Sequence, residues 1–166
     1  GCVEKGLELH LVGARLCNAL IATGQNAKDY GHVFDSISLC LSKGLGAPVG
    51  SVLIGDKDFI RQSRRVRKVL GGGMRQAGII AAGGLYAMKN NIERLQIDHD
   101  NAKLLANAAL ENNKIESVGK VETNSVMLNI NTASKEMVAD LATKESIIYP
   151  MEQQRVRSDK KRHNNH

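Results

Sequence analysis

The chain has 166 residues, 42% of them apolar and 24% charged, which is the composition of an ordinary globular domain with its own core. Its formal charge of +6 is a modest excess that suits an anionic ligand and decides nothing by itself. The three cysteines have no CxxC spacing, which argues against a disulfide framework or a zinc site and favours a reducing compartment.

The sequence gives no sign of membrane insertion or export. No apolar run has the length of a membrane-spanning helix, and the first residues lack the basic-then-apolar pattern of a signal peptide. We therefore expect a cytoplasmic protein without membrane contacts. Because the chain begins at Gly1 in the middle of a pattern, we also expect it to be a fragment.

The first third of the chain predicts strands around a glycine-rich turn. Residues 7–11 are expected to form a strand and residues 14–21 a helix of small side chains. Residues 33–41 partly alternate and are rich in Ile, Val and Phe, which indicates a strand. Three glycines and a proline in 43–50 predict a turn, and the apolar strand 51–54 then suggests a hairpin-like return within a larger sheet.

Three helices are predicted next. The first spans 56–70, with Asp56 as a possible N-cap, and the run Gly71-Gly72-Gly73 ends it. The second, 74–89, is rich in Ala and Gly, which allows close packing against a neighbour. The third, 92–110, is amphipathic, and one side of it carries Ile92, Leu95, His99, Ala102, Leu105 and Ala109.

The pattern changes after Asn112-Asn113. Strands at 118–121 and 125–130, a helix at 134–143 and a strand at 147–149 indicate a small second domain. We assign 1–91 to the end of a large domain and 92–152 to this small domain. The tail 153–166 is basic and polar without apolar periodicity, and we expect it to be disordered.

The helix predicted at 56–70 is strongly basic in its second half. Clustered Arg and Lys side chains either form a solvated helix face or bind the phosphates of a nucleic acid. Aromatic side chains that could stack on bases are missing nearby, so we expect no nucleic-acid partner. The basic residues are Arg61, Arg64, Arg65, Arg67 and Lys68.

Lys43 lies at the start of the glycine-rich turn, where the backbone can approach a cofactor closely. A lysine amine condenses with an aldehyde only when part of it is neutral, whereas a free lysine has a pKa of about 10.4. Taken alone, a lysine in such a turn is most often a solvated loop residue.

The flanking sequence identifies a family resemblance. Residues 38–55 read SLCLSKGLGAPVGSVLIG, and residues 57–88 read KDFIRQSRRVRKVLGGGMRQAGIIAAGGLYAM. Together with LHLVGARLCNA at 9–19 and NNIERLQIDHDNAKLLA at 90–106, they closely resemble the low-specificity threonine aldolases. The resemblance implies an α/β fold, a partial form of fold type I of the pyridoxal-phosphate-dependent transferases, in which the end of a large, mostly parallel-sheet domain precedes a small α/β domain.

The resemblance also implies a function and a set of site residues. Members of this family use pyridoxal 5'-phosphate to cleave L-threonine or L-allo-threonine to glycine and acetaldehyde, and they assemble into homodimers or homotetramers. Lys43 corresponds to the Schiff-base lysine, and Arg15 to a residue at the cofactor ring. Arg75 and Lys68 correspond to positions near the cofactor phosphate or the subunit interface, and Arg155 or Arg157 to the arginine that binds the substrate carboxylate.

One departure from the family pattern supports an alternative. Val12 stands where the family has the aspartate that pairs with the protonated pyridine nitrogen, and an isopropyl group cannot hold that proton. The family's N-terminal half, with its phosphate-binding loop and stacking histidine, also has no counterpart in this sequence. The alternative to an active aldolase is therefore a catalytically inactive, truncated member of the family.

Overall fold

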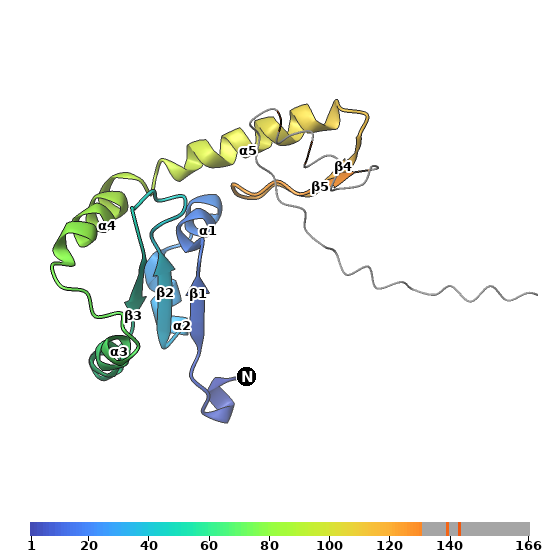
Figure 1. The fold of residues 1–166 in the computed structure, drawn as a ribbon. Helices are drawn as coiled ribbons and strands as arrows, with labels where there is room; N and C mark the ends of the chain where they lie inside the picture. Colours follow the sequence, from blue (N-terminus) through green and yellow to red (C-terminus); the bar gives the residue numbers. More distant parts are fainter. Residues whose placement is uncertain (131–138, 140–142, 144–166) are drawn as a thin grey trace, which may run out of the picture.

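The computed structural model describes residues 1–130, 139 and 143. After a 3-10 turn, η1 (Val3–Lys5), the strands β1 (His10–Gly13), β2 (Ser36–Cys40) and β3 (Ser51–Ile54) form one sheet in the order β1-β2-β3. Strands β1 and β2 are parallel, and β3 returns antiparallel to β2, as Figure 1 shows. The α/β architecture and the hairpin-like return expected from the sequence are both present.

Two short helices connect the parallel strands. Helix α1 (Leu16–Thr23) ends at Gly24, whose φ of 67° is a left-handed conformation that favours glycine. Helix α2 (Ala27–Val33) begins at Asn26, whose side chain accepts a hydrogen bond from the Lys28 amide. The predicted strand at 33–41 is therefore too long, because its first residue ends α2 and β2 begins only at Ser36.

Helix α3 (Lys57–Val69) agrees closely with the sequence prediction. The Asp56 side chain accepts a hydrogen bond from the Phe59 amide at 2.8 Å, so the predicted N-cap is confirmed. Gly71 follows the helix with a φ of 82°, a conformation that stops it. All 13 residues of α3 are at least partly exposed.

Helix α4 (Gly78–Asn90) begins four residues later than predicted. Its glycines allow close packing, because a Cβ on Gly83 would lie 2.8 Å from Pro48 and one on Gly84 would lie 3.0 Å from Leu41. Helix α5 (Leu95–Leu110) starts three residues after the predicted position. Leu105, which the pattern placed on the same side of the helix as Leu95 and His99, is 60% exposed, and Ala106 is buried.

A second, two-stranded sheet follows α5. Strands β4 (Ile115–Val118) and β5 (Leu128–Ile130) pair antiparallel, and the first begins three residues before the predicted strand. Figure 1 shows α5 running from the three-stranded sheet to this second sheet. The predicted helix 134–143, the strand 147–149 and the tail 153–166 lie outside the described residues. The domain boundary at 91/92 stays a prediction.

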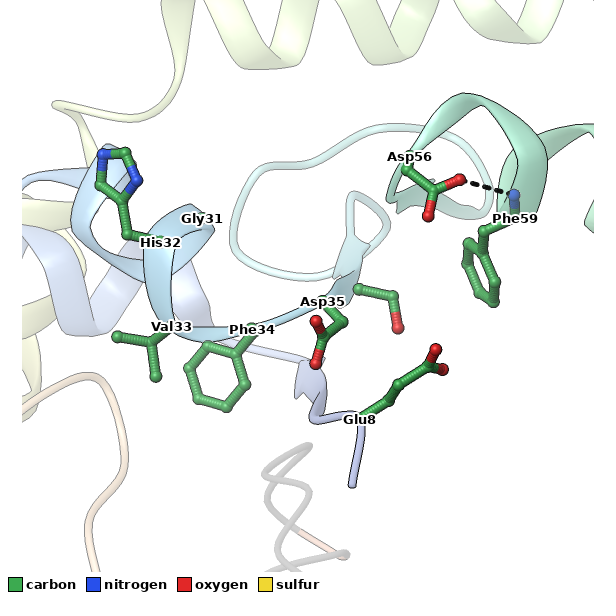
Figure 2. A pocket seen from close by; sticks show the side chains of 9 residues that line it. Glu8, Gly31, His32, Val33, Phe34, Asp35, Asp56 and Phe59 are labelled. Atoms are coloured by element: carbon green, nitrogen blue, oxygen red, sulfur yellow. Dashed lines mark hydrogen bonds between the residues drawn. The ribbon is translucent and has the colours of Figure 1, made fainter. Parts of the chain in front are cut away.

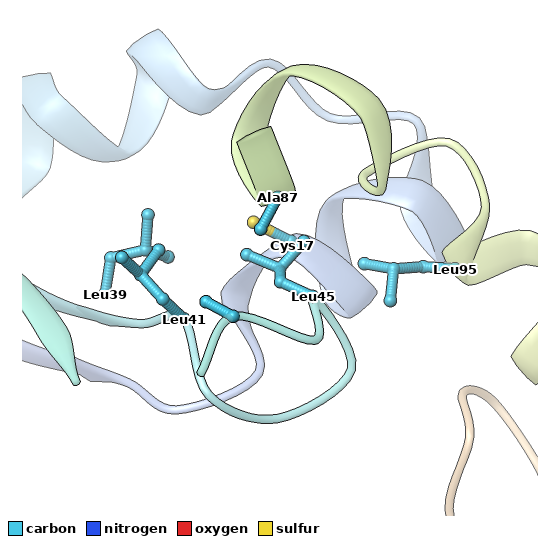
Figure 3. Close-up of a cluster of buried hydrophobic side chains, with 7 residues drawn as sticks. Cys17, Leu39, Leu41, Leu45, Ala87 and Leu95 are labelled. Carbon is cyan, nitrogen blue, oxygen red and sulfur yellow. The ribbon is translucent and has the colours of Figure 1, made fainter. Parts of the chain in front are cut away.

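The main core forms where the first sheet meets α1, α4 and α5. Leu95, in the first turn of α5, is fully buried between side chains from the other elements. Figure 3 shows Leu41, Leu45, Cys17 and Ala87 gathered between the loop that follows β2 and helix α4. The buried members of the cluster are Cys17, Leu39, Leu41, Leu45, Ala47, Ala87 and Leu95.

None of the helices in the described part of the chain is both long and apolar enough to cross a lipid bilayer.

Candidate functional site

The candidate site lies on the loop between β2 and β3. Residues 41–50 form this Lys43 loop, and the Lys43 side chain is exposed on it. Backbone hydrogen bonds close the loop on itself: the Gly46 amide donates to the Lys43 carbonyl at 2.8 Å, and the Ala47 amide donates to the Leu41 carbonyl at 3.1 Å. The predicted turn therefore forms and presents the lysine amine at the carboxyl end of β2.

Arg15 lies at the same edge of the sheet as Lys43. It follows β1 by two residues and stands at the N-cap position of α1, where it is exposed. Because β1 and β2 are parallel, with Gly13 opposite Leu39, their carboxyl ends meet at one edge. This edge is where open α/β sheets bind ligands. The fold thus brings two of the predicted site residues, Lys43 and Arg15, to one edge.

Val12 points from β1 onto an open face of the sheet. It lies opposite Ser38 and is 72% exposed. His10 occupies the same face, since side chains two residues apart on a strand share a face, and its Nδ1 lies 2.8 Å from Ser36 Oγ. The aspartate of the family pattern would project from the position of Val12. An isopropyl group there offers no acceptor to a ring nitrogen.

The thiol of Cys40, the last residue of β2, has a lowered pKa. Burial by itself raises the pKa of the Cys40 thiol, but hydrogen bonding with Ser42 and Ser51 and the charge of Lys43 outweigh this effect and lower the pKa below its usual value. Cys17 in the core shows the opposite behaviour, because burial raises the pKa of its thiol. Among these contributions the hydrogen bonds with Ser42 come before the Lys43 charge, which is the smallest.

Lys68 does not lie with Lys43 and Arg15. Strand β3 runs back from the edge that carries Lys43, so that Ile54 pairs with Ile37 near the start of β2. Helix α3, which carries Lys68, begins there and lies beyond the opposite end of the sheet in Figure 1. Arg75 lies in the segment between α3 and α4. Arg155 and Arg157 are outside the described residues.

A cavity of about 290 Å³ lies at the other edge of the sheet, near the start of β2. Figure 2 shows that the carboxylates of Glu8, Asp35 and Asp56 line it, together with the rings of Phe34 and Phe59. Two of these carboxylates are engaged locally, since Asp35 accepts from the Leu9 amide and Asp56 from the Phe59 amide. This cavity contains none of the predicted site residues.

Helices α4 and α5 hold the Lys43 loop from its buried side. The Asn91 side chain donates to the Leu45 carbonyl at 2.7 Å, and an Arg94 guanidinium nitrogen lies 3.5 Å from the Gly44 carbonyl. Below Gly44, Asn18 of α1 pairs with His99 of α5. No local sequence pattern connects these residues with the loop, although His99 lies on the side of its helix that the apolar pattern marks.

A family model described as beta-eliminating lyase matches residues 1–133. The chain belongs to this family. The resemblance to low-specificity threonine aldolases is also confirmed: over 103 residues the chain is 55% identical to the low-specificity L-threonine aldolase of Escherichia coli K12, an alignment that covers 62% of this chain and 31% of that protein.

Further relatives agree with this family assignment. The low-specificity L-threonine aldolase of Candida albicans is 48% identical over 130 residues, which cover 78% of this chain and 34% of that protein. A solved structure from Exiguobacterium, proposed to be an aromatic amino acid beta-eliminating lyase or threonine aldolase, superposes with a TM-score of 0.74 at 26% identity. That superposition covers 86% of this chain and 40% of the other.

The same fold occurs in a Listeria monocytogenes protein proposed to be an L-allo-threonine aldolase. The TM-score is 0.76 at 24% identity, over 86% of this chain and 40% of that one. The predicted partial fold type I architecture is thereby confirmed. The chain spans about a third of the length of the curated relatives it matches.

The residues at the carboxyl edge fit pyridoxal phosphate in part. An exposed amine on a well-defined loop and a guanidinium on the neighbouring strand end suit an aldehyde and an anionic oxygen. The position of Val12 does not fit, because a pyridinium nitrogen needs a carboxylate or another acceptor there. The described residues therefore offer an exposed amine at this edge but no ring-nitrogen partner at position 12.

Proposed function

We propose that this chain is the part of a pyridoxal-phosphate-dependent threonine aldolase that carries the Schiff-base lysine. The observation that carries the proposal is the position of Lys43, which projects from the carboxyl end of a parallel strand pair together with Arg15. The residues around both lie in a segment that shares 55% identity with a low-specificity L-threonine aldolase. The substrates are L-threonine or L-allo-threonine, and the products are glycine and acetaldehyde.

The chemistry assigned to Lys43 is the covalent capture of the cofactor aldehyde. The Lys43 amine would hold the cofactor by condensing with its aldehyde, with water as the leaving molecule. When bound, the cofactor serves as the electron sink for cleavage of the bond between Cα and Cβ. Arg15 is a permanent, forked donor that holds an anionic oxygen of the ring system in place.

Lys68 and Arg75 are assigned to a different place in the assembly. Because α3 lies beyond the opposite end of the sheet from Lys43, we propose that Lys68 acts at a subunit interface of a homo-oligomer, and that Arg75 acts either there or near the cofactor phosphate. Arg155 or Arg157 is proposed to bind the substrate carboxylate.

The described cysteines Cys2, Cys17 and Cys40 are all free thiols, which supports a cytoplasmic location.

The test uses the absorbance of the protein after addition of pyridoxal phosphate. We expect a band near 420 nm, roughly where such conjugated Schiff bases absorb, that disappears in Lys43→Ala. Lys57→Ala, which removes another exposed lysine at the start of α3, serves as the control and keeps the band. A band of equal intensity in the wild type and Lys43→Ala would refute the assignment of Lys43.

A second candidate function follows from Val12. With valine in place of the aspartate at position 12, the chain forms the cofactor linkage but turns over poorly, as an inactive member of the family. Val12→Asp restores the carboxylate, and we expect it to raise the rate of acetaldehyde release from L-threonine. The gain should be on the order of 100-fold, since one charge-assisted hydrogen bond contributes about 1.5–3 kcal/mol. An unchanged rate in a variant that shows the Lys43 band would contradict the assigned role of this position.

A further inference from the structure

A buried polar pair lies directly beneath the Lys43 loop. Asn18 of α1 is 3% exposed and His99 of α5 is 2% exposed, and they are the buried polar side chains of the described core. Asn18 Nδ2 lies 3.2 Å from His99 Nε2, although the two residues are 81 positions apart in the chain. Polar groups in such surroundings are unfavourable unless they bond to each other. Their contact therefore fixes the side-chain orientation of both residues.

One member of this pair, Asn18, lies next to the residue that follows Lys43. A Cβ added to Gly44 would lie 3.5 Å from Asn18 Oδ1 and only 2.9 Å from Leu95 Cδ2. The space under Gly44 is thus filled by the amide of α1 and by the fully buried Leu95 of α5. Because Asn18 and Leu95 fill this space, the backbone at Gly44 cannot move closer to the core. These two side chains therefore determine the position of the Gly44 backbone.

The next residue of the loop is held from the same side. Asn91, at the junction of α4 and α5, donates to the Leu45 carbonyl at 2.7 Å, and the Leu45 side chain is buried in the core cluster. The backbone after Lys43 is therefore fixed at two successive residues. By contrast, the Lys43 side chain itself is exposed.

We infer that Asn18 and His99 are positioning residues for Lys43. His99 accepts the hydrogen bond that orients the Asn18 amide, and the oriented amide, with Leu95, sets the position of Gly44. This arrangement fixes the direction from which Lys43 Nζ reaches an aldehyde carbon. An error of about 1 Å in such a group is enough to reduce a reaction rate strongly. The inference rests on the proposed function of Lys43, whereas the packing itself exists without a cofactor.

The first test is hydrogen exchange of the cofactor-free protein. His99→Leu removes the acceptor, and Asn18→Ala, a milder change in a helix, removes the donor. We expect the Gly46 and Ala47 amides, which close the Lys43 loop, to exchange about tenfold faster in both variants. His99→Gln keeps an acceptor at a similar reach and should restore slow exchange.

The matched control is Ala106→Gly. This substitution weakens α5 two turns beyond His99 and does not touch the loop. We expect it to lower the thermal midpoint without faster exchange at Gly46 and Ala47. Equal acceleration in the control, in His99→Leu and in Asn18→Ala would overturn the inference, because the effect would then be general loss of stability.

The second test is the pH titration of the Lys43-dependent band with pyridoxal phosphate. We expect the midpoint to move by at least about half a pH unit in Asn18→Ala and His99→Leu, to return in His99→Gln and to stay in place in Ala106→Gly. Identical midpoints in all variants would contradict a positioning role. If the wild type forms no band, the proposed function fails, and the exchange rates alone still decide whether the pair positions the loop.

Discussion

The pKa of the Cys40 thiol depends in part on the positive charge of the neighbouring Lys43. The thiol lies at the end of β2, where hydrogen bonds and the neighbouring ammonium outweigh desolvation and lower its pKa. Cys17, only two residues after Arg15, is buried and has a raised pKa. These two cysteines form an internal comparison, because both belong to the elements that build the candidate site.

This difference predicts the order of alkylation by iodoacetamide. The thiolate is the nucleophile, so at pH 7.5 Cys40 should react severalfold faster than Cys17 in the cofactor-free protein, as measured by mass spectrometry of peptides. Lys43→Ala removes the positive charge, raises the Cys40 pKa and should slow its alkylation. The rate of Cys40 should rise with pH until the thiol is fully ionised. Faster labelling of Cys40 in Lys43→Ala than in the wild type would show that the charge does not act on the thiol.

The stability of helix α3 depends on its N-cap more than on its packing. All its residues are at least partly exposed, and the Asp56 carboxylate accepts the hydrogen bond from the Phe59 amide that begins the helix. Asp56→Ala should therefore lower the free energy of local opening, measured by exchange of the α3 amides, by about 1 kcal/mol.

Asp58→Ala is the matched control for this prediction. Asp58 lies in the same first turn and pairs with Arg61 at 3.0 Å, but both side chains are about three-quarters exposed. Exposed ion pairs of this kind contribute about 0.3–0.5 kcal/mol within a helix. An effect of Asp58→Ala as large as that of Asp56→Ala would contradict the capping role.

The accuracy of the sequence predictions differed between elements for physical reasons. The apolar strand 51–54 and the capped helix after Asp56 carry strong local signals, and both were confirmed. Helix α2 was missed because it is short and has no buried residue, so no apolar period marks it. On α5 the apolar pattern placed Leu105 on the same side as Leu95, but Leu105 is exposed and the smaller Ala106 is buried, since hydrophobicity alone does not say which side a neighbouring element occupies.

The candidate site, too, could be predicted from the sequence only in part. The turn that carries Lys43 follows from its glycines, whereas the identity of the lysine came from the family resemblance. The contact between Asn18 and His99 joins residues 81 positions apart, and no local pattern predicts it. The one available signal was a histidine on the otherwise apolar side of a helix.

At the scale of the whole molecule, the described sheet has free edges and exposed apolar side chains. Within the described residues, β1 pairs only with β2, and β3 pairs only with β2. Val12 is 72% exposed, and Val69, Leu70 and Ile79 around the end of α3 and the start of α4 are 77–80% exposed. Strand edges and apolar surface of this kind favour association.

We therefore expect the 166-residue chain alone to be poorly stable and to self-associate. Sedimentation velocity should show an average mass that rises with protein concentration, and replacement of Leu70 and Ile79 by Ser should reduce the rise. A monomer at all concentrations that unfolds in one cooperative thermal transition would contradict this expectation.

Helix α5 connects the two sheets and is fixed near both ends. Leu95 anchors its first turn in the core beneath Lys43, and its contacts with β4 fix it on the side of the second sheet. With 16 residues the helix is about 24 Å long, so a tilt of roughly 5° moves its far end by about 2 Å. A displacement of the β4–β5 sheet by about 2 Å would therefore rotate the helix by roughly 5° about Leu95, directly beneath the Lys43 loop.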